Sequence, residues 1–145
     1  MILYLDASAL VKCYVTEAGS ADVAAVIEAA RIVATAVISR AEVSAALAKA
    51  VRIGLTTRDA AAAGLADFDA DWCDLIRLDV SEAVVARAAA LAWSQGLRGY
   101  DAVHLACAMT WQEAVGAPVV VATYDRELWR GARMSGLEPW PAALP

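Results

Sequence analysis

The chain has few of the residues that build disulfide frameworks and zinc sites. Its 145 residues include one histidine and three cysteines. The cysteines, Cys13, Cys73 and Cys107, are odd in number and widely spaced, and no second histidine accompanies them. This pattern excludes a disulfide framework and a zinc site. We expect the three cysteines to be buried, reduced thiols.

Long uncharged segments are also missing, although 61% of the residues are hydrophobic. The longest such segments, Ala102–Gln112 and Ala114–Tyr124, are far shorter than the roughly 20 residues that span a bilayer. The sequence opens on Met1–Asp6 with neither a basic segment nor a cleavage site of small residues, which argues against a secretory signal. We therefore expect a soluble, cytoplasmic protein that does not bind membranes.

Positive charge is scarce as well. Lysine and arginine number 12 against 17 aspartates and glutamates, which gives a net charge of -5 and an isoelectric point of about 4.7. This is the wrong sign for a protein that binds nucleic acid through its overall charge. A divalent cation held among carboxylates would, however, reverse the field that a phosphate meets locally.

The length suits a single domain over residues 1–145, and its large apolar share favours a partner or self-association. Apolar runs predict strands at Ile2–Leu5, Ile32–Ala36, Leu75–Asp79, Val119–Ala122 and, as an edge strand, Leu137–Trp140. Segments with helical spacing lie between them, at Ser8–Val15, Asp22–Ala30, Ser39–Gly54, Thr57–Trp72, Ser81–Gln95, Gly99–Val115 and Asp125–Ser135. This alternation predicts a three-layer α/β domain with a central, mainly parallel sheet of four or five strands.

Three acidic residues follow predicted strands near the start of helices: Asp6, Glu42 and Asp125. Because the carboxyl ends of parallel strands lie at one edge of a sheet, we expect these residues to converge. Gathered carboxylates repel one another unless a cation or proton compensates them. Mg²⁺ takes oxygen ligands and suits such a site. Asp101 opens a helix without a preceding strand, so spacing does not place it in this group.

Helix capping is the alternative role of each acid. Ser39 with Glu42 fits the capping box S-x-x-E, and Asp6, Asp101 and Asp125 each suit a helix N-cap. For any one of them taken singly, capping is the favoured interpretation. For the set, the mutual repulsion of the carboxylates favours a cation site.

Four sequence motifs occur in the order found in one family of nucleases. They are Leu5–Leu10, Ser39–Glu42 with Ala45–Leu47 after it, Tyr100–Ala106 and Thr123–Asp125. Together they resemble the four motifs of PIN domains, and the likeness in length and order of elements covers essentially the whole chain. A short, solitary domain of this kind is most similar to VapC-type toxins, which cleave RNA and are restrained by an antitoxin.

The resemblance implies a Mg²⁺-dependent endoribonuclease, with Mn²⁺ as a substitute ion, that acts as the toxin of a toxin–antitoxin pair. The family's catalytic acids correspond to Asp6, Glu42, Asp101 and Asp125. Of these, Asp6 and Asp101 would be the principal metal ligands, and the other two would complete the site directly or through water. A metal-activated water would hydrolyse the phosphodiester bond and leave 5′-phosphate and 3′-hydroxyl ends.

Several neighbours of these acids have two interpretations. Ser8 and Thr123 suit hydrogen bonds to a ligand carboxylate or a phosphate, and equally the capping of a turn or helix. For His104, the only histidine, we expect a packed or hydrogen-bonded structural role. The basic residues near the motifs would guide an RNA backbone or remain solvated surface charge: Lys12, Arg40, Arg98 and Arg126. The tryptophans are expected to pack in the core or in interfaces: Trp72, Trp93, Trp111, Trp129 and Trp140.

The resemblance also implies partners. These are an RNA substrate, a cognate antitoxin and a second copy of the chain in a homodimer. The helical hairpin at about residues 39–72 is rich in alanine and carries Leu47, Val51 and Leu65, and we expect it to offer a groove for an amphipathic antitoxin helix. Internal packing of that hairpin is the alternative.

Other families fit less well. A phosphatase of the haloacid dehalogenase type needs a second aspartate where this chain has Ser8. A receiver domain needs an adjacent acid pair and a lysine at a strand end, and Lys12 and Lys49 are the only lysines. A non-catalytic PIN-like scaffold, whose acids serve as caps, remains the main alternative.

Overall fold

The computed structural model describes all 145 residues and contains one five-stranded sheet. The strands are β1 (Ile2–Leu5), β2 (Ile32–Ala36), β3 (Ile76–Leu78), β4 (Val119–Ala122) and β5 (Glu138–Trp140). The helices are α1 (Ala7–Leu10), α2 (Ser20–Glu28), α3 (Ser39–Arg52), α4 (Arg58–Asp71), α5 (Glu82–Gln95), α6 (Gly99–Val115) and α7 (Arg126–Met134), with a short 3₁₀ helix η1 (Val11–Cys13) after α1. The predicted α/β fold with a parallel sheet is confirmed.

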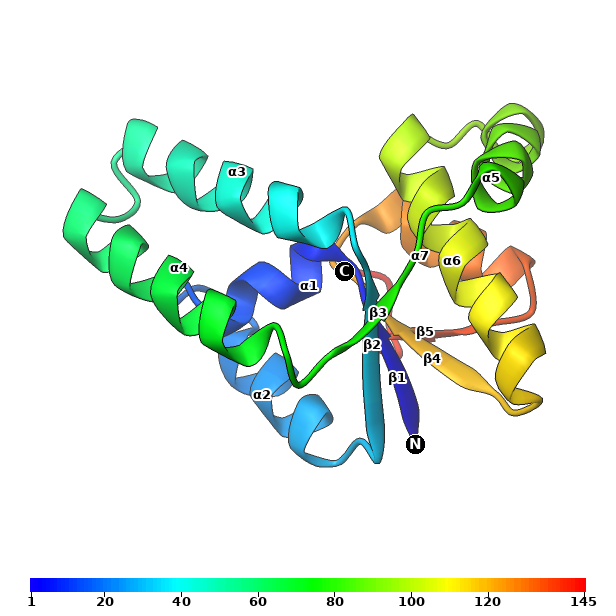
Figure 1. Ribbon diagram of the computed structural model, residues 1–145, viewed down its shortest axis with the longest axis horizontal. Coiled ribbons are helices and arrows are strands. Elements are labelled where there is room, and N and C mark those ends of the chain that lie inside the picture. The colour runs from blue at the N-terminus through cyan, green and yellow to red at the C-terminus, as the bar shows by residue number, and fades with distance from the viewer.

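The sheet is covered on both faces. Helices α1 to α4 lie on one face and α5 to α7 on the other (Figure 1). Successive side chains of a strand point to opposite faces, so Leu3 and Leu5 of β1 pack toward α1–α4, while Tyr4 packs toward α5–α7. All four residues of β1 and of β4 are buried. This explains why both strands are unbroken apolar runs in the sequence.

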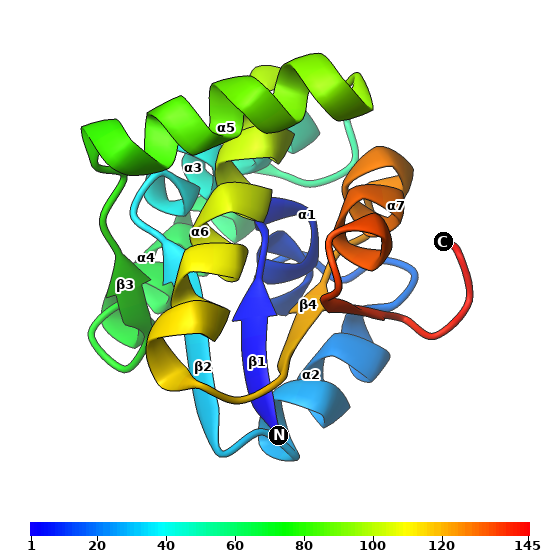
Figure 2. The same cartoon turned by 90° about the vertical axis from the view of Figure 1, so that its right-hand side faces the viewer.

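The strand order is β3-β2-β1-β4-β5, and every pair is parallel. From the central β1, the chain first builds the sheet toward β3 and then returns to add β4 and β5 on the other side. The order therefore reverses between β1 and β4, which is where open α/β sheets place their ligand crevice. Leu5 of β1 is in register with Ala122 of β4, so Asp6 and Thr123 leave the sheet together. The carboxyl ends of the strands point toward the α5 side of the molecule in Figure 2.

Local sequence signals set several helix ends. The Ser81 hydroxyl accepts a hydrogen bond from the Val84 amide at the start of α5, and Gly96 ends that helix in the left-handed conformation. Thr57 caps α4 in the same way. These residues were the expected start and stop positions of the two helices.

The predicted capping box of Ser39 with Glu42 is wrong. Ile38 occupies the N-cap position of α3 and makes no side-chain cap. The Ser39 hydroxyl is buried and lies 2.7 Å from the hydroxyl of Thr35 at the end of β2. The Glu42 side chain is consequently not used for capping, and it turns toward α6.

Helices α3 and α4 form the expected hairpin, which projects from the sheet (Figure 1). Gly64 in α4 lies against the backbone of Tyr14, so a Cβ at this position would be 2.7 Å from the Tyr14 carbonyl oxygen. The ring of Phe68 packs edge-on against Tyr14 and Trp72, with centroids 5.1 and 5.3 Å away. The close approach of α4 to the Tyr14 segment therefore depends on a residue without a side chain.

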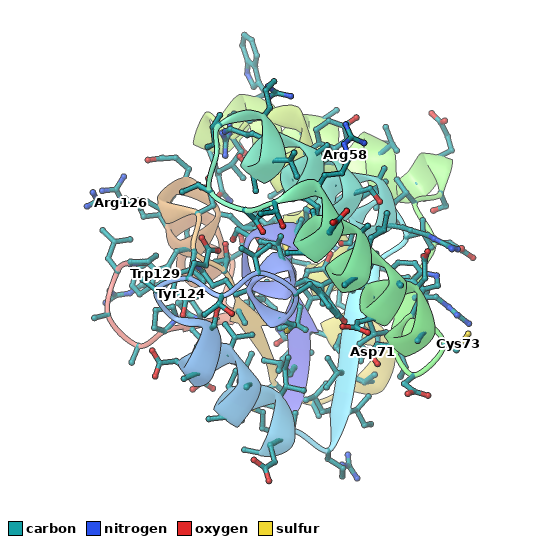
Figure 3. The ribbon with its side chains drawn as sticks, turned by 90° about the vertical axis from the view of Figure 1, so that its left-hand side faces the viewer. Arg58, Asp71, Cys73, Tyr124, Arg126 and Trp129 are labelled. Atoms are coloured by element: carbon teal, nitrogen blue, oxygen red, sulfur yellow. The ribbon has the colours of Figure 1, made fainter.

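Two expectations about burial need correction. All three thiols are free, as expected, but Cys13 and Cys73 are exposed because they lie at the ends of η1 and α4, and only Cys107 is buried. Figure 3 shows Cys73 at the rim of the molecule. Trp72, Trp111 and Trp129 are buried as expected, whereas Trp93 on α5 is 92% exposed and packs in no core, so that its packing in an interface stays a prediction. No helix is both long and apolar enough to cross a membrane.

Candidate active site

Asp6 is the N-cap of α1 and the most enclosed of the four acids. Its residue is 4% exposed. The Ala9 amide donates to its Oδ1 at 3.0 Å, and the Ser8 hydroxyl lies 2.8 and 2.9 Å from its two oxygens. The Thr123 hydroxyl donates to Oδ2 at 2.9 Å. Asp6 therefore caps a helix, and it also lies at the sheet edge where strand order reverses.

Ser8 and Thr123 tie the loop after β1 to the loop after β4. The Thr123 hydroxyl accepts a hydrogen bond from the Asp125 amide at 3.0 Å, and the Ser8 hydroxyl accepts one from the Tyr124 amide at 2.8 Å. With their acceptor sides occupied, both hydroxyls direct their protons toward Asp6. The two predicted supporting residues therefore contact an acid of the site and orient it.

Asp125 and Asp101 come from different helices and share one counter-ion. Asp125 caps α7, where its Oδ1 accepts from the amides of Glu127 and Leu128 at 2.9 Å each. Asp101 lies in the first turn of α6 but caps nothing, so its interpretation as an N-cap is wrong. The Arg98 guanidinium donates from Nε to Oδ2 of Asp101 at 2.7 Å and from Nη2 to Oδ2 of Asp125.

Glu42 lies in the first turn of α3 and contacts the sole histidine. His104 Nε2 is 2.7 Å from Oε2 of Glu42, and His104 Nδ1 is 2.8 Å from the hydroxyl of Tyr4. His104 is 2% exposed and has the packed, hydrogen-bonded position expected of it. Tyr4 was missed as a neighbour of the site. The sequence did contain a signal for this contact. Tyr4 lies in the middle of a strand that is buried on both faces, and a buried tyrosine hydroxyl needs a hydrogen-bond partner.

Burial raises the pKa of Asp6 above its ordinary value, although the hydrogen bonds from Ala9, Ser8 and Thr123 oppose this. Burial also raises the pKa of Asp101; the hydrogen bond from Arg98 lowers it, and the nearby charge of Asp125 raises it further. Both carboxylates are thus held where ionisation is costly. A cation at this place would stabilise their charged forms.

A cleft of about 690 Å³ lies beside these acids. Glu42, Arg98 and Asp101 form its polar wall. Apolar side chains of α5 and α6 form most of the rest, chiefly Val85, Ala88, Ala89, Ala92 and Val103. The cleft gives solvent and solutes a path to two of the four acids, while Asp6 and Asp125 are not among its lining residues.

The side chains of the site that could bind Mg²⁺ are its four carboxylates. As the side chains stand, no three His, Cys, Asp or Glu residues are close enough to hold a metal ion together. The available donors are carboxylate oxygens, which Mg²⁺ prefers, and a positive group already bridges Asp101 and Asp125. The bridging Arg98 side chain is 72% exposed, so it can turn into solvent. The residues fit Mg²⁺ in chemistry and charge once Arg98 leaves.

The other basic residues near the motifs lie elsewhere. Lys12 pairs with Glu17 at 3.0 Å and Arg40 with Asp69 at 2.9 Å. Arg126 extends away from the fold (Figure 3). Of the four basic candidates, Arg98 alone contacts the acids.

Comparison with known proteins bears on this site. A family model described as PIN domain matches residues 3–133. Ribonuclease VapC45 of Mycobacterium tuberculosis (strain CDC 1551 / Oshkosh) is 38% identical over 148 residues, which cover 99% of this chain and 97% of that protein.

Two solved structures share the fold. PAE2754 from Pyrobaculum aerophilum superposes with a TM-score of 0.64 at 24% identity, covering 96% of this chain and 83% of that one. A toxin–antitoxin complex from Klebsiella pneumoniae superposes with a TM-score of 0.56 at 16% identity, covering 83% and 84% of the two chains. At these identities the two structures support the fold alone.

Proposed function

The chain belongs to the PIN domain family, in its VapC branch, and from this premise we propose that the protein is the endoribonuclease toxin of a toxin–antitoxin pair. The observation that carries the proposal is the arrangement of the acids. Asp101 and Asp125 converge on one guanidinium, and Asp6 is joined to the Asp125 backbone through Thr123. The group lies where strand order reverses, at the edge of the sheet that open α/β folds use for ligands.

Asp6 and Asp101 would hold Mg²⁺ as principal ligands, and Glu42 and Asp125 would complete the site directly or through water. When bound, Mg²⁺ supplies charge neutralisation at the phosphate and lowers the pKa of water. In the hydrolysis, water adds to phosphorus as the bond to the 3′-oxygen breaks, which leaves 5′-phosphate and 3′-hydroxyl ends. Glu42 faces the cleft with an oxygen that no protein group binds, and it suits acceptance of the proton that water loses.

The antitoxin would bind the α3–α4 hairpin. A groove of about 560 Å³ runs between these helices and is lined mainly by apolar side chains, among them Leu47, Val51 and Leu65. An amphipathic helix fits such a groove with its apolar face inward. A chain with this fold is part of a toxin–antitoxin complex from Klebsiella pneumoniae. Exposed apolar residues, such as Leu55 at 70% and Trp93 at 92%, support a homodimer.

Cleavage of RNA tests the proposal. Purified protein is incubated with structured RNA in Mg²⁺, in Mn²⁺ and in EDTA, alongside the variants Asp6→Asn and Asp101→Asn. Asp69→Asn is the matched control, because Asp69 lies in an exposed ion pair with Arg40 away from the acids. We expect cleavage with either ion by the wild type and Asp69→Asn, and a loss of at least about 100-fold in the site variants.

Cleavage that persists in EDTA or in Asp101→Asn would overturn the proposed mechanism. The rival function is a non-catalytic PIN-like scaffold. It predicts that neither Mg²⁺ nor Mn²⁺ binds at these carboxylates, which calorimetric titration of the protein with Mn²⁺ measures directly.

A further inference from the structure

Three side chains from three elements form one hydrogen-bonded line through the protein. The Tyr4 hydroxyl in β1 reaches Nδ1 of His104 in α6 at 2.8 Å, and Nε2 of the same ring reaches Oε2 of Glu42 in α3 at 2.7 Å. Tyr4 is fully buried and its ring stands edge-on to the imidazole, with centroids 5.9 Å apart. The line therefore joins the strand that leads into Asp6 to the helix that carries Glu42.

The donors and acceptors along this line can be assigned. An ionised carboxylate only accepts hydrogen bonds, so the proton between His104 and Glu42 belongs to Nε2. The Tyr4 hydroxyl carries a hydrogen that it can donate, and its oxygen lies 2.8 Å from Nδ1 of the ring. Donation from Tyr4 requires Nδ1 of His104 to be the acceptor. The ring is consistent with one neutral tautomer, in which Nε2 carries the hydrogen.

Glu42 accepts a hydrogen bond from one group only, as Asp101 does from Arg98, but the single donor of Glu42 is itself buried. Asp6 accepts hydrogen bonds from three groups, and Asp125 accepts from two backbone amides and Arg98. Glu42 accepts only from His104, and no protein group donates to its Oε1. A glutamate side chain has three rotatable bonds and substantial rotamer freedom. His104 is thus what fixes the Glu42 carboxylate in the cleft wall.

We infer that His104 is a positioning residue, which Tyr4 holds as the Nε2–H tautomer and which in turn fixes Glu42 with its Oε1 free toward the cleft. This rests on the proposed ribonuclease function, in which Glu42 acts at the reacting phosphate. Small errors in the placement of a catalytic group are costly. Residues that hydrogen-bond to a metal ligand or a reacting group typically contribute 10- to 100-fold to activity or metal affinity.

The first test uses the fact that the chain has a single histidine. Long-range ¹H–¹⁵N correlation spectra of the metal-free protein at neutral pH report its tautomer without ambiguity. We expect a protonated Nε2 and an unprotonated Nδ1 in the wild type, and a larger share of the Nδ1–H tautomer in Tyr4→Phe, where Glu42 alone favours the hydrogen on Nε2. Tyr124→Phe is the matched control, because that hydroxyl contacts Gly19 and not the imidazole. A proton on Nδ1 in the wild type would overturn the inference.

The second test compares two substitutions of the histidine. His104→Gln keeps an N–H near the position of Nε2, whereas His104→Ala removes it. We expect His104→Ala to lower kcat by about 10- to 100-fold with KM for RNA within about twofold, and His104→Gln to recover most of the loss. Equal impairment of both variants, with melting temperatures that show both are folded, would mean that His104 serves packing alone.

The two tests separate failure of this inference from failure of the proposed function. The tautomer is measured without substrate or metal, so it is decided even if no RNA is cleaved. If His104→Ala does not fold, Tyr4→Phe serves in the kinetic comparison. It is expected to reduce kcat less than His104→Ala does, because the donor to Glu42 remains and only the hydrogen bond that helps to hold its tautomer is lost.

Discussion

Arg98 donates from Nε to the Oδ2 oxygen of Asp101 at 2.7 Å, from a position three residues earlier in the chain. The same guanidinium also bridges to Asp125. One exposed side chain thus supplies the positive charge between two acids that would otherwise repel each other. In the metal-free protein Arg98 does what a bound cation would do, and the two compete for the same carboxylates.

Arg98→Gln is therefore expected to bind metal more tightly than the wild type. Removal of one positive charge at a partly solvated site corresponds to roughly 1 kcal/mol, or about fivefold in affinity. Calorimetric titration with Mn²⁺ measures the change. Arg40→Gln removes an arginine from a surface pair distant from the site and is expected to bind Mn²⁺ as the wild type does. Weaker binding by Arg98→Gln would show that the arginine organises the site rather than competing for it.

The buried acids are expected to lower the stability of the metal-free protein as the pH rises. The folded-state pKa of Asp101 is raised, so between the unfolded and folded pKa values the folded protein binds more protons than the unfolded chain. Stability then falls as the pH rises through the folded pKa. Asp101→Asn removes this loss of stability, and in EDTA its melting temperature is expected to fall less between about pH 4 and pH 7.5 than that of the wild type.

Thermal unfolding in EDTA at both pH values checks this expectation, with Asp69→Asn as an exposed control. Addition of Mg²⁺ to the wild type at pH 7.5 is expected to restore stability, because a ligand that binds only the folded state stabilises it. If the melting temperatures of Asp101→Asn and the wild type fall equally, Asp101 is not the cause of the loss of stability.

Gly64→Ala is expected to destabilise the protein, against the usual trend. In the interior of a helix, alanine is typically about 0.5–1 kcal/mol more favourable than glycine. Here the added Cβ would lie 2.7 Å from a backbone oxygen of Tyr14, and the forced shift should cost about 1–3 kcal/mol. Chemical denaturation measures the difference. Ala63→Gly, at the exposed neighbouring position, should cost no more than about 1 kcal/mol; a stabilised Gly64→Ala would contradict the close packing.

Much of the fold was predictable because its signals are local. The ranges of β2 and β4 follow from short apolar runs, and both ends of α5 follow from Ser81 and Gly96. The meeting of Asp6 and Thr123 follows from parallel strands that end at one edge. These features depend on residues close to one another in the sequence, or on a rule that holds for all sheets of this kind.

What the sequence could not reveal depends on tertiary contacts. Asp101 follows no strand, and only the packing of α6 against α7 brings it and Arg98 to Asp125. The capping box at Ser39 failed because the buried hydroxyl of Thr35 is a nearer partner. His104 could be predicted to pack, but its contact with Glu42 spans 62 positions. Such pairings between different helices leave no periodic pattern in the sequence.

The pairing of β1 with β4 has a consequence for how the protein is made. Ile2 is in register with Val119, so the first strand to leave the ribosome stays without its central neighbour until most of the chain has been translated. Asp6 meets Thr123, and Arg98 meets Asp125, only after that. Long-range pairing of this kind also slows folding. Chains that end before β4 therefore lack the contacts that assemble this group of acids.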